Sequence, residues 1–142
     1  MYQAIVYGHP TPPSGTWRDN LVWDQHSLIQ KGTHPRDPRG RGAISEYRVV
    51  ERFASTSLVE VRLVTGKRNQ IRIQARLRGH TLVGERRYIF GPAELRPIDF
   101  SRQALHAARL TVNHPATRRA QTFEAPLPDD MVELIAELRR SS

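Results

Sequence analysis

Two neighbouring segments with a two-residue period constrain the fold of this 142-residue chain more than any other feature. Residues 58–64 read LVEVRLV, in which apolar side chains alternate with Glu60 and Arg62, as in a strand that buries one face. Residues 46–53, EYRVVERF, form a second strand-like run, and only the four residues ASTS separate the two segments. This short connection predicts an antiparallel hairpin.

A helix is expected directly after the hairpin, over residues 69–78, where Gly79 is well placed to end it. An apolar stripe begins at Ile71. Arg72 and Arg76 stand four residues apart and are therefore expected to form a basic ridge on the same helix. The chain is thus expected to pass from a hairpin into a short basic helix.

The rest of the chain predicts shorter elements. Extended pieces are expected at residues 2–7, 21–23, 27–30, 107–113 and 121–124, and a closing helix at 128–140. Residues 33–43, rich in Pro, Gly and charge, are expected as a surface loop, and residues 84–102 as an irregular segment. Together these elements predict an α+β fold: a mixed, mainly antiparallel sheet with flanking helices, in a single unit spanning residues 1–142.

Charge narrows the range of partners. Lys and Arg number 22 against 14 Asp and Glu, and the resulting net charge of +8 favours a polyanionic partner, because neutralising phosphates releases counterions. A basic surface without a specific ligand is the alternative that charge leaves open. The sequence has no Cys for disulfides or thiolate metal sites, and no apolar run of about 18 residues that could span a membrane. We therefore expect a cytoplasmic protein with no membrane contact.

Residues 65–88, TGKRNQIRIQARLRGHTLVGERRY, concentrate this charge. Arginine suits phosphate because its planar fork donates two parallel hydrogen bonds. A solvated helix face would have the same spacing, so a phosphate site and an unspecific surface both remain open. The cations that fall within about three helical turns are Lys67, Arg68, Arg72, Arg76 and Arg78.

The same segment resembles the signature of the RluA-type RNA pseudouridine synthases (the RluA/RsuA-like family). In that family a motif T-G-R/K-x-x-Q-I/L-R-I/V is followed by G-H-x-I/L/V-x-G-D/E-x-x-Y. The first half is matched by Thr65, Gly66, Lys67, Gln70, Ile71, Arg72 and Ile73, and the second by Gly79, His80, Leu82, Gly84, Glu85 and Tyr88. The opening YQAIVYG, the hairpin, and residues 102–117 and 123–128 resemble the family as well, so the resemblance covers nearly the whole chain.

The resemblance implies an enzyme that converts a uridine in folded ribosomal or transfer RNA to pseudouridine, with no cofactor and no metal. Tyr2 matches the family's active-site tyrosine, which packs against the flipped base. Arg72 matches the arginine that pairs with the catalytic aspartate. His80 is expected to be a local hydrogen-bond partner rather than a catalyst. The substrate-binding residues that the resemblance implies are Ile71, Lys67, Arg68 and Gln70.

The catalytic aspartate itself is expected to be absent. The family carries it in an H-R-L/I-D-x-x-T-S-G segment, several dozen residues before the strand that Tyr2 begins here. We therefore expect residues 1–142 to be a partial catalytic domain, without its N-terminal part and without activity of its own. The aspartates present, none of them in such a context, are Asp19, Asp24, Asp37, Asp99, Asp129 and Asp130.

Three functions remain open from the sequence. The chain is a truncated pseudouridine synthase, a non-catalytic RNA-binding protein derived from that fold, or a basic structural protein such as a ribosomal component. In the first two, the partner is structured RNA. A sheet without the family's preceding strands would also expose an edge, so self-association or a complementing chain is expected there.

Overall fold

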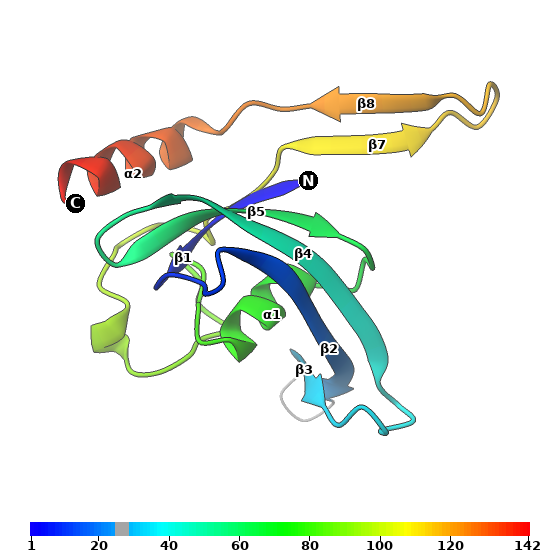
Figure 1. The fold of residues 1–142 in the computed structure, drawn as a ribbon, viewed down its shortest axis with the longest axis horizontal. Coiled ribbons are helices and arrows are strands. Elements are labelled where there is room, and N and C mark those ends of the chain that lie inside the picture. Colours follow the sequence, from blue (N-terminus) through cyan, green and yellow to red (C-terminus); the bar gives the residue numbers. More distant parts are fainter. Residues whose placement is uncertain (25–28) are drawn as a thin grey trace.

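The predicted hairpin lies at the middle of the protein's main sheet. We describe a computed structural model that places residues 1–24 and 29–142 (Figure 1). In it, six antiparallel strands follow the order β3-β2-β4-β5-β1-β6. This architecture confirms the predicted α+β class. The strands are β1 (Tyr2–Tyr7), β2 (Ser14–Asp24), β3 (Ile29–Thr33), β4 (Arg41–Arg52), β5 (Thr56–Leu63) and β6 (Leu105–Ala107).

The register of β4 against β5 shifts once, close to the turn of the hairpin. Val49 pairs with Val59, but Glu51 pairs with Leu58, so Val50 is the extra residue of a bulge. Its side chain is exposed. Because a bulge bends the strand and increases its twist, the long β4 curves away at this end of the sheet.

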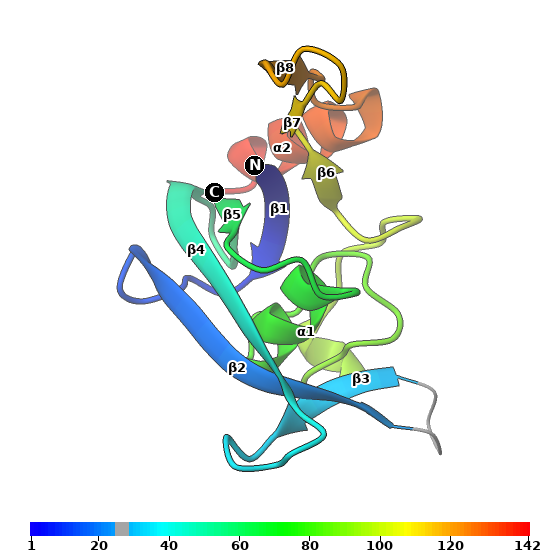
Figure 2. The same cartoon turned by 90° about the vertical axis from the view of Figure 1, so that its right-hand side faces the viewer.

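The two helices pack on opposite faces of the sheet (Figure 2). Successive residues of a strand point to opposite faces, so neighbouring residues of β1 contact different helices. Helix α1 (Gln70–Leu77) buries Ile71 against Val6 and Val59. Helix α2 (Asp129–Arg140) buries Met131 and other apolar residues against Ile5, the neighbour of Val6 in β1. The helix predicted at residues 69–78 is thus confirmed, and Gly79 follows it with φ of +76°.

The strand expected at residues 107–113 is divided into two. β6 belongs to the main sheet, whereas β7 (Arg109–Asn113) pairs only with β8 (Ala120–Glu124). These two strands, called the β7–β8 ribbon below, project from the body of the protein, and every residue in them is exposed (Figure 1). A lone two-stranded ribbon is marginally stable in water, so its order depends on its anchor at the sheet.

One further expectation needs revision. β2 begins at Ser14, well before the extended piece expected at residues 21–23. The piece expected at residues 27–30 lies partly outside the described residues, and β3 begins at Ile29. The irregular segment 84–102 contains one short 3₁₀ turn, Ala93–Leu95.

In the part of the chain that the structure places, no helix is long and apolar enough to cross a membrane.

Candidate active site

A small cavity lies where β1, β5 and β6 meet the first turn of α1. It encloses about 210 Å³. Among the predicted site residues, Arg68 is the one that does not line it. We call this space the Tyr2 cavity. Its lining residues are Tyr2, Leu63, Lys67, Asn69, Gln70, Ile71, Arg72, Gln103 and Leu105.

Tyr2 is held by strands on both sides. In the sheet it pairs with Val61 of β5 and with Ala107 of β6. Its side chain is half-buried and packs beside Leu63 and Leu105. Since alternate residues of β1 share a face, Tyr2 points to the α1 side of the sheet, as Val6 does.

The residue before Tyr2 is tied to the root of the β7–β8 ribbon. The Met1 amino group donates to the Arg109 carbonyl at 2.7 Å. The Met1 carbonyl accepts from the amides of Ala108 and Arg109 at 2.9 and 3.1 Å. These bonds fix the direction in which β1 enters the sheet, and so they help to position Tyr2.

Gln70 is used for folding rather than left free at the cavity. Its amide oxygen accepts from the Thr65 hydroxyl at 2.8 Å and from the Lys67 amide at 3.0 Å. Its amide nitrogen donates to the Ile44 carbonyl at 3.0 Å and to the Ser45 hydroxyl at 2.8 Å. All four bonding positions of the amide are therefore occupied. This contrasts with the substrate contact expected of Gln70 from the sequence, because the side chain instead fixes the turn that carries Lys67.

Arg72 forms an ion pair with Glu85 across the loop that follows α1. Its Nε and one terminal nitrogen each lie 2.6 Å from an oxygen of Glu85. The Glu85 side chain is fully buried, and that of Arg72 is 18% exposed. The Arg72 guanidinium also lies 5.1 Å from the centre of the Tyr88 ring. The basic ridge predicted for the helix is therefore wrong for Arg72, although Arg76 is exposed.

Glu85 in turn organises the second half of the motif. Its Oε1 accepts from the backbone amides of Arg86, Arg87 and Tyr88 at 3.2, 3.0 and 3.3 Å. Burial raises the pKa of Glu85, but the hydrogen bonds and charge of Arg72, with the backbone amides, outweigh it and hold the pKa below its ordinary value. The hydrogen bond to Glu85 raises the pKa of Arg72. Both groups are therefore charged at neutral pH.

The ion pair does not use every donor of Arg72. A guanidinium has five N–H groups. Two of them donate to Glu85, and the other terminal nitrogen donates to the side-chain oxygen of Asn69 at 3.3 Å. Arg72 is itself a lining residue of the cavity, and no Asp or Glu of the described residues lines it. A further anionic group in the cavity would therefore meet Arg72 and no opposing carboxylate.

The other cations of the motif lie at and beyond the cavity wall. Lys67 lines the cavity, while Arg68 is exposed outside it, with its guanidinium carbon 6.0 Å from the centre of the Trp23 ring. His80 donates through Nδ1 to the Tyr7 carbonyl at 2.9 Å, the local role expected from the sequence. Sequence reasoning missed Asn69 and Gln103, which line the cavity without a motif role that could have indicated them.

Three of the placed aspartates are bonded in other parts of the fold. Asp19 accepts from Arg78 and Gln74 of α1, Asp37 pairs with Arg39, and Asp130 pairs with Arg102 at the start of α2. The side chain of Asp24 lies outside the described part of the structure. No described aspartate lines the Tyr2 cavity.

Comparison with known proteins supplies the family context. Residues 1–77 match the family model described as RNA pseudouridylate synthase. The chain is 41% identical over 140 residues to the uncharacterized RNA pseudouridine synthase YlyB of Bacillus subtilis, covering 99% of this chain and 44% of that protein. It is 37% identical over 151 residues to ribosomal large subunit pseudouridine synthase D of Vibrio cholerae, covering 99% and 45%. The chain thus spans less than half the length of these relatives.

Solved structures agree on the fold. Human RNA pseudouridylate synthase domain containing 1 superposes with a TM-score of 0.74 over 97% of this chain and 64% of that one. Human RNA pseudouridylate synthase domain containing 4 superposes with a TM-score of 0.72 over 97% of this chain and 61% of that one. Both are 19% identical to the chain, so this likeness concerns the fold alone.

Proposed function

Because this chain belongs to the RNA pseudouridylate synthase family, we propose that it is the base-holding and RNA-binding part of an enzyme that isomerises uridine to pseudouridine. The observation that carries the proposal is the Tyr2 cavity, which gathers Tyr2, Ile71 and Arg72 from separate elements. The relatives named for the ribosomal large subunit favour ribosomal RNA over transfer RNA as the substrate. We include action in the cytoplasm in this proposal.

The cavity suits a pyrimidine base taken out of its stack. An enzyme that works on a base within folded RNA has to extract it and replace the lost stacking with side chains. Tyr2 offers an aromatic face and Ile71 an apolar wall on one side of the cavity. Lys67, at its rim, provides a cation for the phosphate of the flipped nucleotide.

The reaction needs a carboxylate, and none of the described residues that line the cavity is Asp or Glu. In the isomerisation the bond from N1 to C1′ of the ribose breaks and a bond from C5 to C1′ forms, while C5 loses a proton and N1 gains one. A carboxylate beside C1′ assists this exchange, and the remaining donors of Arg72 can hold it in place. We propose that residues 1–142 form one part of the catalytic domain, and that the aspartate comes from another segment or another chain.

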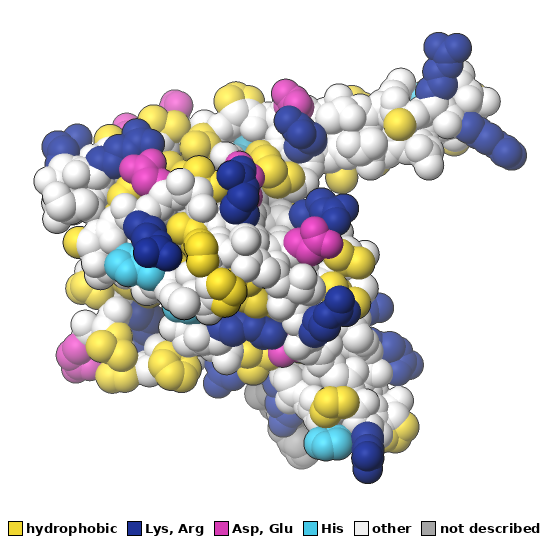
Figure 3. Space-filling model, viewed as in Figure 1, with side chains coloured by type: hydrophobic (Ala, Val, Ile, Leu, Met, Phe, Trp, Pro, Cys, Tyr) yellow, Lys and Arg dark blue, Asp and Glu magenta, His cyan; other side chains and the backbone are white. Residues whose placement is uncertain are grey.

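The cleft beneath the β7–β8 ribbon is the surface where we propose that this other segment lies. It measures about 1050 Å³ and is hollowed between the ribbon and the sheet (Figure 3). Its charged walls are already paired, Arg48 with Glu60 at 2.6 Å and Arg62 with Glu46 at 2.8 Å. Such a neutral surface suits a polypeptide better than phosphates. The length of the relatives beyond the match supports the remainder of the enzyme as the occupant.

The isomerisation can be followed by tritium release. RNA labelled at C5 of uridine loses its label only when C5 bonds to the ribose. We expect release when this chain is joined to the rest of the Bacillus subtilis relative, and none from the 142 residues alone. Binding of ribosomal RNA without release in either form would instead favour the non-catalytic RNA-binding protein, which the absence of a carboxylate at the described cavity wall also supports.

Sedimentation tests the proposed occupant of the cleft. Leu110 and Phe123 are opposite one another on the ribbon and are 59% and 57% exposed. Replacing both by Ser should weaken binding of the remaining part of the enzyme, whereas Val132→Ser on the exposed side of α2 should not. Dimers of the chain that persist with that part present would mean that a second copy occupies the cleft.

A further inference from the structure

Trp23 is the more exposed of the two tryptophans of the chain. Its side chain is 43% exposed, whereas Trp17, the other tryptophan of the chain, is 5% exposed and stacks on Tyr47 with ring centres 4.8 Å apart. Tryptophan, with a large apolar ring and one N–H donor, is enriched at surfaces that bind a ligand or partner.

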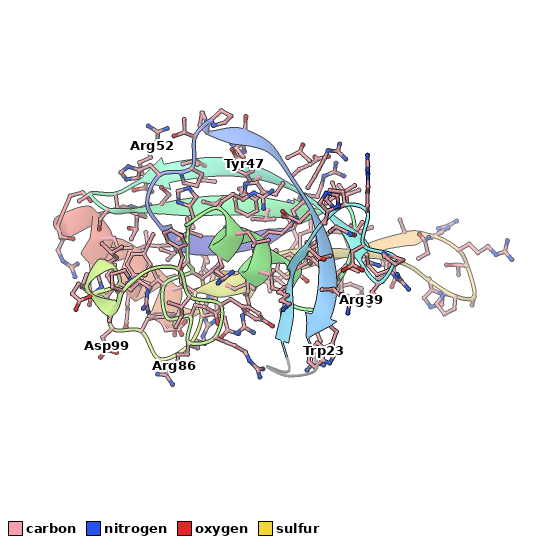
Figure 4. The ribbon with its side chains drawn as sticks, turned by 90° about the horizontal axis from the view of Figure 1, so that it is seen from below. Trp23, Arg39, Tyr47, Arg52, Arg86 and Asp99 are labelled. Atoms are coloured by element: carbon pink, nitrogen blue, oxygen red, sulfur yellow. The ribbon has the colours of Figure 1, made fainter. Side chains whose placement is uncertain are left out.

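Strand geometry places Trp23 on the side of the sheet that carries the Tyr2 cavity. Residues 17, 19, 21 and 23 of β2 share one face. Trp17 packs in the cluster that contains Ile71 of α1, and Asp19 accepts a hydrogen bond from Gln74 of α1. Trp23 therefore continues the face of β2 that α1 covers, beyond the last buried residues (Figure 4).

The neighbour of Trp23 is a cation of the same motif. The guanidinium carbon of Arg68 lies 6.0 Å from the centre of the Trp23 ring. Arg68 follows Lys67, which lines the Tyr2 cavity, so a nucleotide chain leaving the cavity past Lys67 meets Arg68 next. The protein thus offers an aromatic ring with a cation over it, and this cation is the chain neighbour of a residue that lines the cavity.

We propose that Trp23 and Arg68 form a stacking site for an unpaired nucleobase adjacent in the RNA to the one held in the Tyr2 cavity. Bases in single-stranded RNA stack on aromatic rings and on guanidinium planes, and such stacking tolerates any base because every base has a π-face. Arg68 would at the same time contact the phosphate of that nucleotide. The inference rests on the proposed function, because it needs RNA at the cavity.

The two tryptophans provide a direct measurement. Trp17→Phe leaves Trp23 as the sole tryptophan, and adding a short oligouridylate should quench its emission in a saturable way. Trp23→Phe leaves the buried Trp17, whose emission should report an intact fold and stay unchanged on addition of the same RNA. An unquenched Trp23 at RNA concentrations that saturate the protein would overturn the stacking site.

Affinity measurements separate stacking from charge. Trp23→Ala should weaken binding of an RNA with an unpaired segment by about 10-fold or more, and Trp23→Phe by much less. A blunt RNA duplex should bind both variants alike. Arg68→Ala should also weaken binding and lower the salt dependence by about one phosphate contact. Arg52→Ala, which removes an exposed arginine on the opposite side of the molecule, is the matched control (Figure 4).

The outcomes distinguish this site from the proposed function. If RNA binds and Trp23→Ala binds it as the unchanged protein does, the stacking site is wrong and the proposed function still holds. If the unchanged chain binds no RNA, either alone or joined to the rest of the Bacillus subtilis relative, the proposed function fails. The stacking site then fails with it.

Discussion

Arg72 and Glu85 stand 13 residues apart in the sequence and form a bidentate ion pair, with both nitrogen–oxygen distances at 2.6 Å. The pair joins the first turn of α1 to the loop that begins at Gly84, so it connects the two halves of the sequence motif. Because Glu85 also accepts from three backbone amides, it gives Arg72 one orientation at the wall of the Tyr2 cavity.

Removing the charge of Glu85 should destabilise the fold. Glu85→Gln keeps an oxygen for the backbone amides but leaves Arg72 without its anion, and breaking a buried ion pair costs about 3–5 kcal/mol. Since Arg72 is partly exposed, we expect the lower end, about 3 kcal/mol, in urea unfolding. Glu46→Gln, which breaks the exposed pair with Arg62, is the control and should cost less than about 1 kcal/mol. Equal losses in the two variants would mean that the Arg72 pair is no stronger than a surface pair.

Lowering the pH should remove the stability that the Arg72–Glu85 pair contributes. The pKa of Glu85 is lowered in the fold, so its contribution to stability is complete above the unfolded value of about 4.3 and is lost as pH falls through the folded pKa. The difference in unfolding free energy between the unchanged protein and Glu85→Gln should therefore shrink as pH falls below about 4. Arg139 lowers the pKa of Glu51, and Arg102 lowers that of Asp130. Both carboxylates are present in the two proteins, so their contributions cancel in the difference. A difference that stays constant down to about pH 2 would contradict the assignment.

The role of Arg72 in binding needs a variant that leaves no buried charge behind. Arg72→Ala alone would strand Glu85, so lost binding could reflect lost folding. Arg72→Met combined with Glu85→Gln removes both charges and keeps the acceptor for the backbone amides. We expect RNA binding by this double variant to weaken by about 1–3 kcal/mol relative to Glu85→Gln, measured by fluorescence anisotropy. Equal affinities would remove Arg72 from the RNA site.

Tyr2 should contribute to RNA binding through its aromatic ring. Tyr2→Phe should keep RNA affinity near that of the unchanged protein, because the aromatic face remains. Tyr2→Ala should lower affinity for an RNA with an unpaired uridine by about 1–3 kcal/mol, the usual worth of one base–aromatic stack. Full affinity in Tyr2→Ala, with the fold intact by circular dichroism, would limit Tyr2 to packing in β1.

Gly84 is required by the backbone rather than by chemistry. Its φ is +81°, and a Cβ there would collide with the carbonyl oxygen of Arg102. Gly84→Ala should cost more than about 1 kcal/mol of stability, since the conformation is wrong for alanine and the neighbour is backbone. Gly42→Ala, where nothing lies within 4 Å of the new atom, should change the melting temperature little. Similar melting of the two variants would show that this loop adapts easily.

Local signals account for the parts of the fold that were predicted correctly. The hairpin of β4 and β5, and α1 with Gly79 after it, depend on short periods and on one residue that tolerates positive φ. The start of β2 at Ser14 was missed because Pro12, Pro13 and Gly15 are typical of a loop. That part of β2 is a strand through its pairing with β4, in which Ser14 lies opposite Arg48. Such distant pairing has no local signature.

The sequence indicated several residues that line the cavity, but not the partners that these residues bond to. The sequence indicated Tyr2, Ile71 and Arg72 together, and the structure brings all three to one cavity. It could not indicate that Glu85 turns Arg72 away from solvent, because helical spacing shows only which residues share a face. Likewise, the amide of Gln70 could not be assigned to the turn, because two of its partners, Ile44 and Ser45, come from β4.

The hydrogen bonds of Met1 link the β7–β8 ribbon to the Tyr2 cavity. Met1 is bonded to the root of the β7–β8 ribbon, and the next residue, Tyr2, lines the cavity. A polypeptide that steadies the ribbon therefore also restricts Tyr2, and a base packed on Tyr2 restricts the ribbon. Linked equilibria are reciprocal, so the factor by which one partner tightens the other's binding is the same in both directions. Under the proposed function, we therefore expect binding of the remaining part of the enzyme and binding of RNA to be cooperative.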